Sequence, residues 1–525
     1  MSDTNIEITC SETLKNLLEK YKDNEYMYQR LYSHVVNYLP NTLEIEMKNH
    51  EERVNRNNFL TNEQKVFIKV FLNKNKYYYL SNNNFFYYYD GEKYLIIKED
   101  DIIHKILTTI SKDRVLIQWK YKTKISIINL IKERSLFSCI PETDTIQNVL
   151  NAICPSYFTS KNSAKYFLTI IGDNIHKKSS HLIFYISQQM KQFINEVDNV
   201  AVLSIGHSNV TNNFMVKYHE NHSYENCRLI KINNYSNNVW RELLKKIGLD
   251  MMCVSAYYSS CYENSDKFIE TKVDEELKTY TYYLKNNKQE YIANEFCNKF
   301  ILDNNNDNND NNDNKLEWKN IHFLWKQFLS DNNLPNIMYT TSLKNILKEK
   351  YTYDEVSDSF KGITSKYLPI YRDFINFWNS TIKIDTELSN NNFYNELEID
   401  EICSLFKIKT KQSISEEIVL KILTHFFPNI EIVDNKFILN VRSIYWDKNE
   451  DIYSSFEFIK NKILHLDDDS NLVPIDDIYN YYKECCYHNS MRLLVSKRYF
   501  ENYIYYKLPN YIVYDKFINT NWIFN

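Results

Sequence analysis

Glycine is scarce in this chain, with 5 among 525 residues, where ordinary usage would give about 37. A loop that cradles phosphate needs closely spaced glycines, because its backbone N–H groups must approach the phosphate oxygens. No two glycines here are close in sequence; they are Gly91, Gly172, Gly206, Gly248 and Gly362. The chain therefore lacks a Walker-type loop, a dinucleotide loop, a kinase loop and a nucleophile elbow. These absences argue against the common ATPases, dehydrogenases, kinases and α/β-hydrolases.

Proline is scarce as well, with 8 residues, whereas tyrosine is abundant, with 44. The abundant residue types (Asn, Lys, Ile, Tyr, Phe) have A/T-rich codons, and the scarce types (Gly, Pro, Ala) have G/C-rich codons. A strongly A/T-rich genome would produce both trends. The tyrosine content by itself therefore indicates no function.

A strong excess of one charge is also missing, because the formal net charge is −5. This balance argues against a wholly basic nucleic-acid coat protein, although local basic patches remain possible. The ten cysteines include no CxxC pair, which is typical of reduced, mostly buried thiols. No uncharged apolar run approaches the roughly 18 residues of a membrane span, and the polar N-terminus is unlike a signal peptide. We therefore expect no membrane association.

An Asn/Asp-rich segment, residues 303–314, has no apolar side chain to bury, and this composition predicts a disordered linker. This segment divides the chain into two parts. We predict a multidomain protein of the α+β class that is mostly helical. The expected parts are a helical N-terminus with a β-meander (1–140, meander 77–98), an α+β middle domain (141–302), the linker (303–316), a helical domain (317–392) and two winged-helix-like units (393–525).

The meander is predicted from aromatic runs that are broken by turn residues. Asn82-Asn83-Asn84 separates the first two runs, and Asp90-Gly91 separates the second from the third. Asp-Gly between two β-rich runs is a strong hairpin signal, because the tight turn needs positive φ angles.

The two C-terminal units are predicted from a pattern that occurs twice. Each copy reads helix, helix, and then two short strands with a polar break, within 396–441 and 474–524. This order matches a winged helix, in which a helix-turn-helix variant precedes a β-hairpin. Short helix–helix–hairpin runs are also common in ordinary α+β proteins, so both interpretations stay open.

Four residues are candidate metal ligands: His207, His219, His222 and Cys227. Imidazole and thiolate groups at short spacing could bind Zn²⁺, but the spacing fits no standard zinc finger. The alternative is that they are polar loop histidines beside a buried cysteine. A nuclease-like triplet, Asp266 with Glu270 and Lys272, is a weaker match, because such triplets arise by chance in charged chains.

Basic character is local. The segment from Lys112 to Arg134 contains seven Lys or Arg residues and only two acidic residues, Asp113 and Glu133, and aromatic residues are interleaved with them. Such a segment could contact phosphates and stack bases, or it could be an ordinary solvated helix face. The second winged-helix candidate is also basic around its second helix. The candidate phosphate contacts are Lys120, Lys122, Lys124, Arg134, Lys497 and Arg498.

Several long segments resemble an uncharacterised family of mimivirus-like giant DNA viruses. They are WKYKTKISIINLIKERSLFSCIPETDTIQNVLNAICPSYF (119–158), AKYFLTIIGDNIHKK (164–178) and the blocks from FLWKQFLSDNNLPNIMYTTSLKNILKEK to DSFKGITSKYLPIYRDFINFW (323–378). The resemblance covers roughly residues 30–525 and fits the codon bias. It implies no established activity, and it supplies no catalytic residues.

Two further segments are similar to the non-ATPase parts of poxvirus-type viral primase-helicases: FFYYYDGEKYLIIKEDDIIHKIL (85–107) and VSKRYFENYI (495–504). The ATPase core and its phosphate loop are missing here, so this resemblance implies DNA-binding or partner-binding parts without helicase activity.

These observations predict a non-enzymatic viral protein that binds DNA or RNA, or that serves replication or transcription as an accessory factor. One alternative is a structural or interaction protein of the virion or viral factory. A second is a metal-dependent enzyme using zinc, which would be the only cofactor. The resemblance implies viral replication, transcription or virion proteins as partners, and a location in the host cytoplasm (the viral factory) or the virion.

Overall fold

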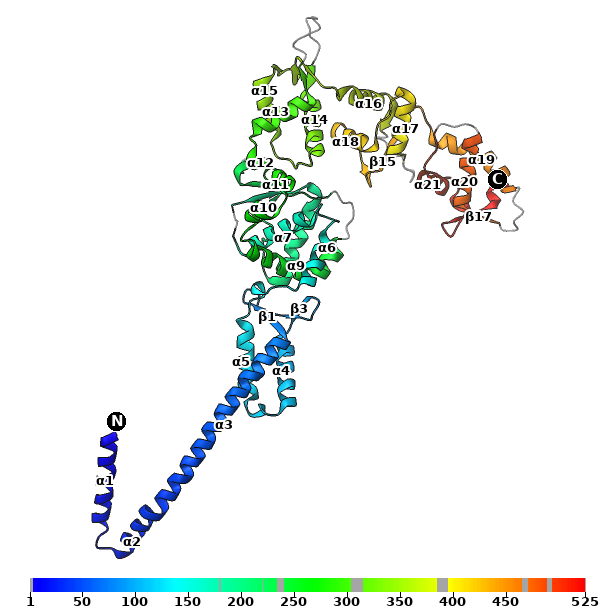
Figure 1. Ribbon diagram of the computed structural model, residues 1–525. Helices are drawn as coiled ribbons and strands as arrows, with labels where there is room; N and C mark the ends of the chain where they lie inside the picture. Colours follow the sequence, from blue (N-terminus) through cyan, green and yellow to red (C-terminus); the bar gives the residue numbers. More distant parts are fainter. Residues whose placement is uncertain are drawn as a thin grey trace. The chain divides into compact units, whose positions relative to one another are not determined.

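The computed structural model describes residues 3–178, 181–219, 221–233, 240–303, 315–384, 395–464, 471–488 and 493–524. The chain forms two compact units, residues 1–287 and 288–525 (Figure 1). It is mostly helical with small sheets, as the sequence predicts. The division precedes the expected linker at 303–316, because α13 (Gln289–Phe300) packs on helices that follow the linker. Residues 304–314 themselves lie outside the described residues.

The first unit begins with α1 (Asp3–Lys20), α2 (Glu25–Ser33), a π-helical turn (His34–Tyr38) and the long α3 (Leu39–Lys74). No side chain between residues 5 and 59 is buried, and the buried residues of α3 begin at Leu60. We call residues 3–59 the helical arm. The second half of α3 packs on the sheet and helix that follow, where Phe71 and Leu72 are buried.

The predicted meander is confirmed. Strands β1 (Lys76–Leu80), β2 (Phe85–Tyr89) and β3 (Tyr94–Ile97) form an antiparallel sheet in that order. In the loop between β2 and β3, the Asp90 carboxylate accepts hydrogen bonds from the N–H groups of Glu92 and Lys93. Gly91 has a φ of +113°, a region that favours glycine. Helices α4 (Glu99–Asp113) and α5 (Lys120–Lys132) complete this subdomain with an isoleucine-rich core.

A larger core follows in the same unit. Helices α6 (Thr143–Ile153), α7 (Lys161–Ile175), α8 (Lys191–Ile205) and α9 (Trp240–Cys261) surround a small parallel sheet of β4 (Ile183–Tyr185), β5 (Phe214–Met215) and β6 (Cys227–Leu229). Three short helices end the unit: α10 (Ser265–Lys272), α11 (Glu275–Thr281) and α12 (Tyr283–Asn286). Gly172 resembles a helix stop in the sequence, but α7 continues through it to Ile175.

The second unit repeats one arrangement three times: strand, helix, helix, strand, strand. The first repeat is β8 (Lys315–Glu317), α14 (Trp318–Asp331), α15 (Thr340–Lys350), β9 (Tyr353–Asp354) and β10 (Ser359–Lys361). The second is β13 (Glu396–Glu398), α17 (Ile399–Thr410), α18 (Glu416–Phe426), β14 (Ile432–Val433) and β15 (Phe437–Leu439). The third is β17 (Leu472–Pro474), α20 (Ile475–His488), α21 (Lys497–Lys507), β18 (Ile512–Val513) and β19 (Phe517–Asn519).

Strand order is the same in all three repeats. The last strand lies in the middle and pairs with the first and the second, giving β8-β10-β9, β13-β15-β14 and β17-β19-β18. A helix precedes each repeat: α13, α16 (Leu368–Thr381) and α19 (Lys448–Leu464). Two strand pairs flank the first two repeats, namely β7 (Leu302–Asp303) with β11 (Ile363–Thr364) and β12 (Ile382–Ile384) with β16 (Val441–Ser443).

The sequence pattern identifies the second and third repeats but misses the first. The region 317–392, which we expected to be a helical domain, contains most of the first repeat and its sheet. Its strands are as short as those of the other two repeats, but its hairpin segment, 353–361, is mostly polar and lacks two apolar runs around a polar break.

Candidate nucleic-acid interface

The predicted basic segment lies on α5 and the turn before it, with Lys120 and Lys124 on one side of the helix and Lys122 on the other. Helix α5 buries Thr123, Ile127, Ile128 and Ile131, so the intervening residues point outward. Lys122 is exposed, and Lys120 and Lys124 are partly exposed. None of these three lysines forms an ion pair with any described part of the chain.

Aromatic and apolar side chains accompany the three lysines. Tyr121 is 69% exposed, and Ile117 and Ile125, four residues to either side of it, are also exposed. The ammonium group of Lys122 lies 3.8 Å from the ring centroid of Trp119, a cation–π contact. These residues therefore combine positive charge that no carboxylate compensates with aromatic rings that solvent can reach.

The structure adds one cation that the sequence pattern did not indicate. Arg56 of α3 donates a hydrogen bond to the Gln118 side chain (2.7 Å), beside the start of α5. The buried pair Gln64–Thr123 also joins α3 to α5, with the Gln64 amide 3.1 Å from the Thr123 hydroxyl. No local pattern could reveal this neighbour, because 62 residues separate Arg56 from Gln118. We call Arg56, Lys120, Tyr121, Lys122 and Lys124 the α5 surface.

Arg134, a further predicted contact, lies apart from this group. It follows the end of α5, and the helix's 13 residues span about 20 Å. Its guanidinium donates to the Leu72 carbonyl (3.3 Å), and its own carbonyl accepts from the Tyr79 N–H. Arg134 thus also joins α3 to β1.

The predicted contacts in the third repeat, Lys497 and Arg498, are next to carboxylates of this chain. The Lys497 ammonium lies 2.5 Å from an Asp476 oxygen, a contact that raises the lysine pKa, and 3.7 Å from Glu501. The Arg498 Nε lies 3.4 Å from Glu396, and its guanidinium stacks 4.0 Å from the Phe437 ring centroid.

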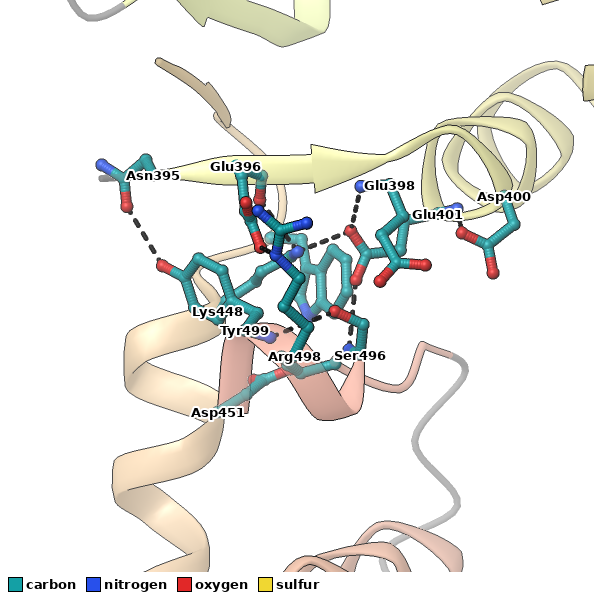
Figure 2. A network of polar contacts seen from close by, with 12 residues as sticks. Asn395, Glu396, Glu398, Asp400, Glu401, Lys448, Asp451, Ser496, Arg498 and Tyr499 are labelled. Carbon is teal, nitrogen blue, oxygen red and sulfur yellow. Dashed lines mark hydrogen bonds and ion pairs between the residues drawn. The ribbon is translucent and has the colours of Figure 1, made fainter. Parts of the chain in front are cut away.

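These contacts belong to a polar network between the second and third repeats (Figure 2). At its centre Lys448 and Glu401 form an ion pair of 2.5 Å. Glu401 also accepts from the backbone N–H of Glu398 at 2.8 Å and from that of Ser496 at 3.3 Å. Lys448 donates to the Glu396 carbonyl at 3.0 Å, and its ammonium lies 4.4 Å from the Tyr499 ring centroid.

Burial sets the charge behaviour of this network. Loss of hydration raises the pKa of Glu401 and lowers that of Lys448, and their mutual attraction opposes both effects. Glu398 and Glu401 also form a capping box at the start of α17, so a local capping signal contributes to a contact between repeats.

A groove of about 730 Å³ borders this network. Its charged lining residues are Lys436, Lys497 and Arg498, and Glu398, Asp400, Glu401 and Glu501. Carboxylates at such short range would repel phosphate, so this groove fits a nucleic acid less well than the α5 surface does.

The four candidate metal ligands have other neighbours. The ring of His207 lies 3.2 Å from the Asn82 amide and 5.5 Å from the Phe137 ring centroid. The Tyr185 hydroxyl lies 2.7 Å from His222 Nδ1, while Cys227 Sγ donates to the Ser223 carbonyl. The rings of His219 and His222 are 5.6 Å apart. Within the described ranges, no three His, Cys, Asp or Glu side chains gather as a metal site would need.

The nuclease-like triplet does not have the geometry that such an enzyme needs. Asp266, Glu270 and Lys272 all lie on helix α10 rather than on neighbouring strands. Asp266 forms a bidentate ion pair with the buried Arg228, at 2.8–2.9 Å. Its carboxylate therefore ties α10 to β6.

Comparisons with known proteins identify no relative: no family model, curated protein or solved structure matches this chain. Among the helices of the described residues, none combines the length and the apolar character needed to cross a membrane.

Proposed function

We propose that this protein is a non-enzymatic nucleic-acid-binding protein, and that its α5 surface contacts the phosphate backbone. The observation that carries the proposal is the group formed by Lys120, Lys122 and Lys124. They lie on one helix, no carboxylate of the described chain pairs with them, and Arg56 lies beside them. Cations without carboxylate partners supply the counterion-release term that dominates nucleic-acid affinity.

The three repeats are proposed to be winged-helix units. The strand–helix–helix–strand–strand order and the central last strand, present three times, support this assignment. In DNA-binding winged helices the second helix of the unit enters the groove. Here the corresponding helices are α15, α18 and α21, and their charges favour another role.

The three second helices carry their cations next to acids. In α15, Lys344 pairs with Asp358 at 2.8 Å. In α18, Glu416 and Glu417 occupy the first turn, where they oppose phosphate. In α21, Lys497 and Arg498 contact carboxylates as described above. We therefore propose that the repeats bind protein, either each other or a partner, while the α5 surface binds nucleic acid.

The viral context is a proposal that rests on the resemblance of residues 119–158, 164–178 and 323–378 to the giant-virus family. In that context the chain serves viral replication or transcription, in the viral factory or in the virion. A structural role in the virion is the second candidate, and the exposed apolar side chains of the helical arm favour it.

A titration of the full chain with DNA and RNA oligonucleotides at two salt concentrations tests the main proposal. The Lys120→Glu, Lys122→Glu, Lys124→Glu triple variant removes the proposed contacts. Each lost phosphate contact should reduce the slope of log affinity against log salt by about one, and therefore by about three in all.

The matched control applies the same charge change elsewhere, at Lys245, Lys272 and Lys366, which are exposed lysines outside the α5 surface. This control variant should bind like the wild type. Absence of binding at low salt, or an equal loss of affinity in the two triple variants, would contradict the proposal.

A further inference from the structure

The helical arm has apolar side chains that nothing in the described chain buries. Between residues 5 and 59 every side chain is exposed or partly exposed. Thirteen large apolar side chains of this segment are exposed: Ile6, Ile8, Tyr26, Tyr28, Tyr32, Val36, Tyr38, Leu39, Leu43, Ile45, Met47, Val54 and Phe59. In proteins most helical stability comes from packing of an apolar face. We therefore expect the arm to pack against a partner surface.

Four exposed apolar residues of α3 form a stripe along one side of the helix, while Ile45 and Phe59 lie on the opposite side. Successive residues of an α-helix are about 100° apart, so Leu39, Leu43, Met47 and Val54 lie within a sector of about 80°. The same sector contains Ile68 and Leu72 in the second half of the helix, and both pack on the core under the meander. Figure 1 shows α3 as one continuous helix. The stripe therefore adjoins the side of the helix that faces the core, where Leu60, Gln64 and Phe71 are buried.

We propose that the arm binds the arm of a second copy of this chain, with the two α3 helices antiparallel and their stripes in contact. The crossing lies near His50, so that Met47 of one copy packs against Val54 of the other. Residues 39–59 then bury the stripe, as the second half of the helix already buries Leu72 in the same sector.

Charge beside the stripe favours a second copy and this direction. Glu46 and Arg53 lie on the same flank of the stripe, and neither has an ion-pair partner among the described residues. In an antiparallel pair like flanks meet, so Glu46 of each copy faces Arg53 of the other. In a parallel pair each Glu46 would instead face Glu51 of the other copy, which gives two repulsive contacts, whereas the antiparallel pair brings only the two Glu51 residues together.

Sedimentation of the full-length protein over a range of micromolar concentrations tests the proposal. The wild type should sediment as a dimer. Met47→Asp, which places a charge in the stripe, should raise the dimer dissociation constant by at least tenfold. Met47→Asp should not disturb the fold of the chain, because Met47 is 60% exposed and is not part of the hydrophobic core.

Ile45→Asp is the matched control. Ile45 is 62% exposed and belongs to the same helix, but it lies about 200° round the helix from Leu43. The variant should dimerise like the wild type. Circular dichroism should show the same helix content in both aspartate variants.

A charge exchange tests the direction of the pair. Glu46→Arg or Arg53→Glu alone should weaken the dimer by about tenfold, because each creates two like-charge contacts. The double variant should restore it. A monomeric wild type, as when α1 covers the stripe or another protein occupies it, would overturn the proposal. Equal effects of Met47→Asp and Ile45→Asp, or a double exchange that fails to restore the dimer, would do so as well.

Discussion

Lys448 and Glu401 form an ion pair of 2.5 Å although the side chain of each is only 5% exposed. Glu401 lies in α17 of the second repeat, and Lys448 lies in α19, the helix that precedes the third repeat. Removal of one partner of a buried ion pair destabilises the folded state, because the other charge stays buried without water or a counter-charge. The contact therefore makes the second and third repeats dependent on each other.

The first prediction concerns this pair. Lys448→Met leaves the Glu401 carboxylate buried without its counter-charge, and we expect the second unit to lose about 3–5 kcal/mol of stability. Thermal and urea unfolding of the full chain measure the effect. Lys462→Met, which breaks the exposed pair with Glu484 (44% and 47% exposed), should cost about 1 kcal/mol or less. Equal costs for the two variants would contradict the prediction.

The second prediction is a preference for single strands at the α5 surface. Tyr121 is 69% exposed, and a base stacked on an aromatic ring contributes about 1–3 kcal/mol. Tyr121→Ala should weaken binding of single-stranded oligonucleotides by about tenfold and leave duplex binding nearly unchanged. Tyr291→Ala, at an exposed tyrosine of α13, is the control. The prediction is contradicted if duplexes bind the wild type as tightly as single strands do and lose as much affinity in Tyr121→Ala. The surface would then recognise phosphate alone.

The third prediction is a pH dependence from Asp250. Burial raises the pKa of Asp250 to about 6, although its carboxylate accepts the Tyr94 backbone N–H at 2.8 Å. The folded state therefore holds a proton that the unfolded chain releases above its usual pKa near 3.8. The free energy of unfolding should fall by about 3 kcal/mol as pH rises from about 4 to 6.

Asp250→Asn should remove this contribution. The measurement is the difference in unfolding free energy between wild type and variant at several pH values, which cancels the other titrating groups. A difference that does not vary with pH would contradict the prediction.

The fourth prediction concerns Gly172. A Cβ at this position would lie 2.0 Å from the Ser255 carbonyl oxygen of α9, so Gly172→Ala must push α7 and α9 apart. We expect a loss of about 3 kcal/mol or more. At Gly248 the Cβ would instead meet the Val200 side chain at 2.4 Å, which can move. Gly248→Ala should therefore cost less, and thermal unfolding compares the two variants.

The fifth prediction tests the zinc hypothesis for His207, His219, His222 and Cys227. If these residues bind Zn²⁺, purified protein will contain stoichiometric zinc, and a chelator will lower its unfolding temperature. The described residues bring no three such side chains together, which predicts the other result, protein without zinc and no response to chelator. Elemental analysis decides between them.

Some local features could be inferred from the sequence because they depend on neighbours in the chain. The aromatic runs around Asp90-Gly91 specify the meander, and Ser496 caps α21 as its position predicts, with its hydroxyl accepting from the Tyr499 N–H. Two of the three repeats were visible, because their helices have clear apolar periodicity. The first repeat was not, since its hairpin segment, 353–361, is mostly polar and lacks the paired apolar runs of the other two.

Other features depend on residues that are far apart in sequence. Gly172 has the appearance of a helix stop, yet its role is to let α9 approach α7. Lys497 and Arg498 have the appearance of phosphate contacts, and only the folded chain brings Asp476 and Glu396 beside them. Arg56 joins the α5 surface from 62 residues before Gln118.

By itself, the sequence determined the mostly helical class, the meander and the scarcity of glycine, which removes every common phosphate-binding loop. Those properties follow from composition and local spacing. Tertiary structure alone decided which charges stay unpaired and which apolar faces stay uncovered, because an ion pair or a packed face needs two segments to meet. Gly91 has a local role in a turn, and Gly172 and Gly248 have packing roles, while the candidate binding surface lies mostly on α5, a helix without glycine.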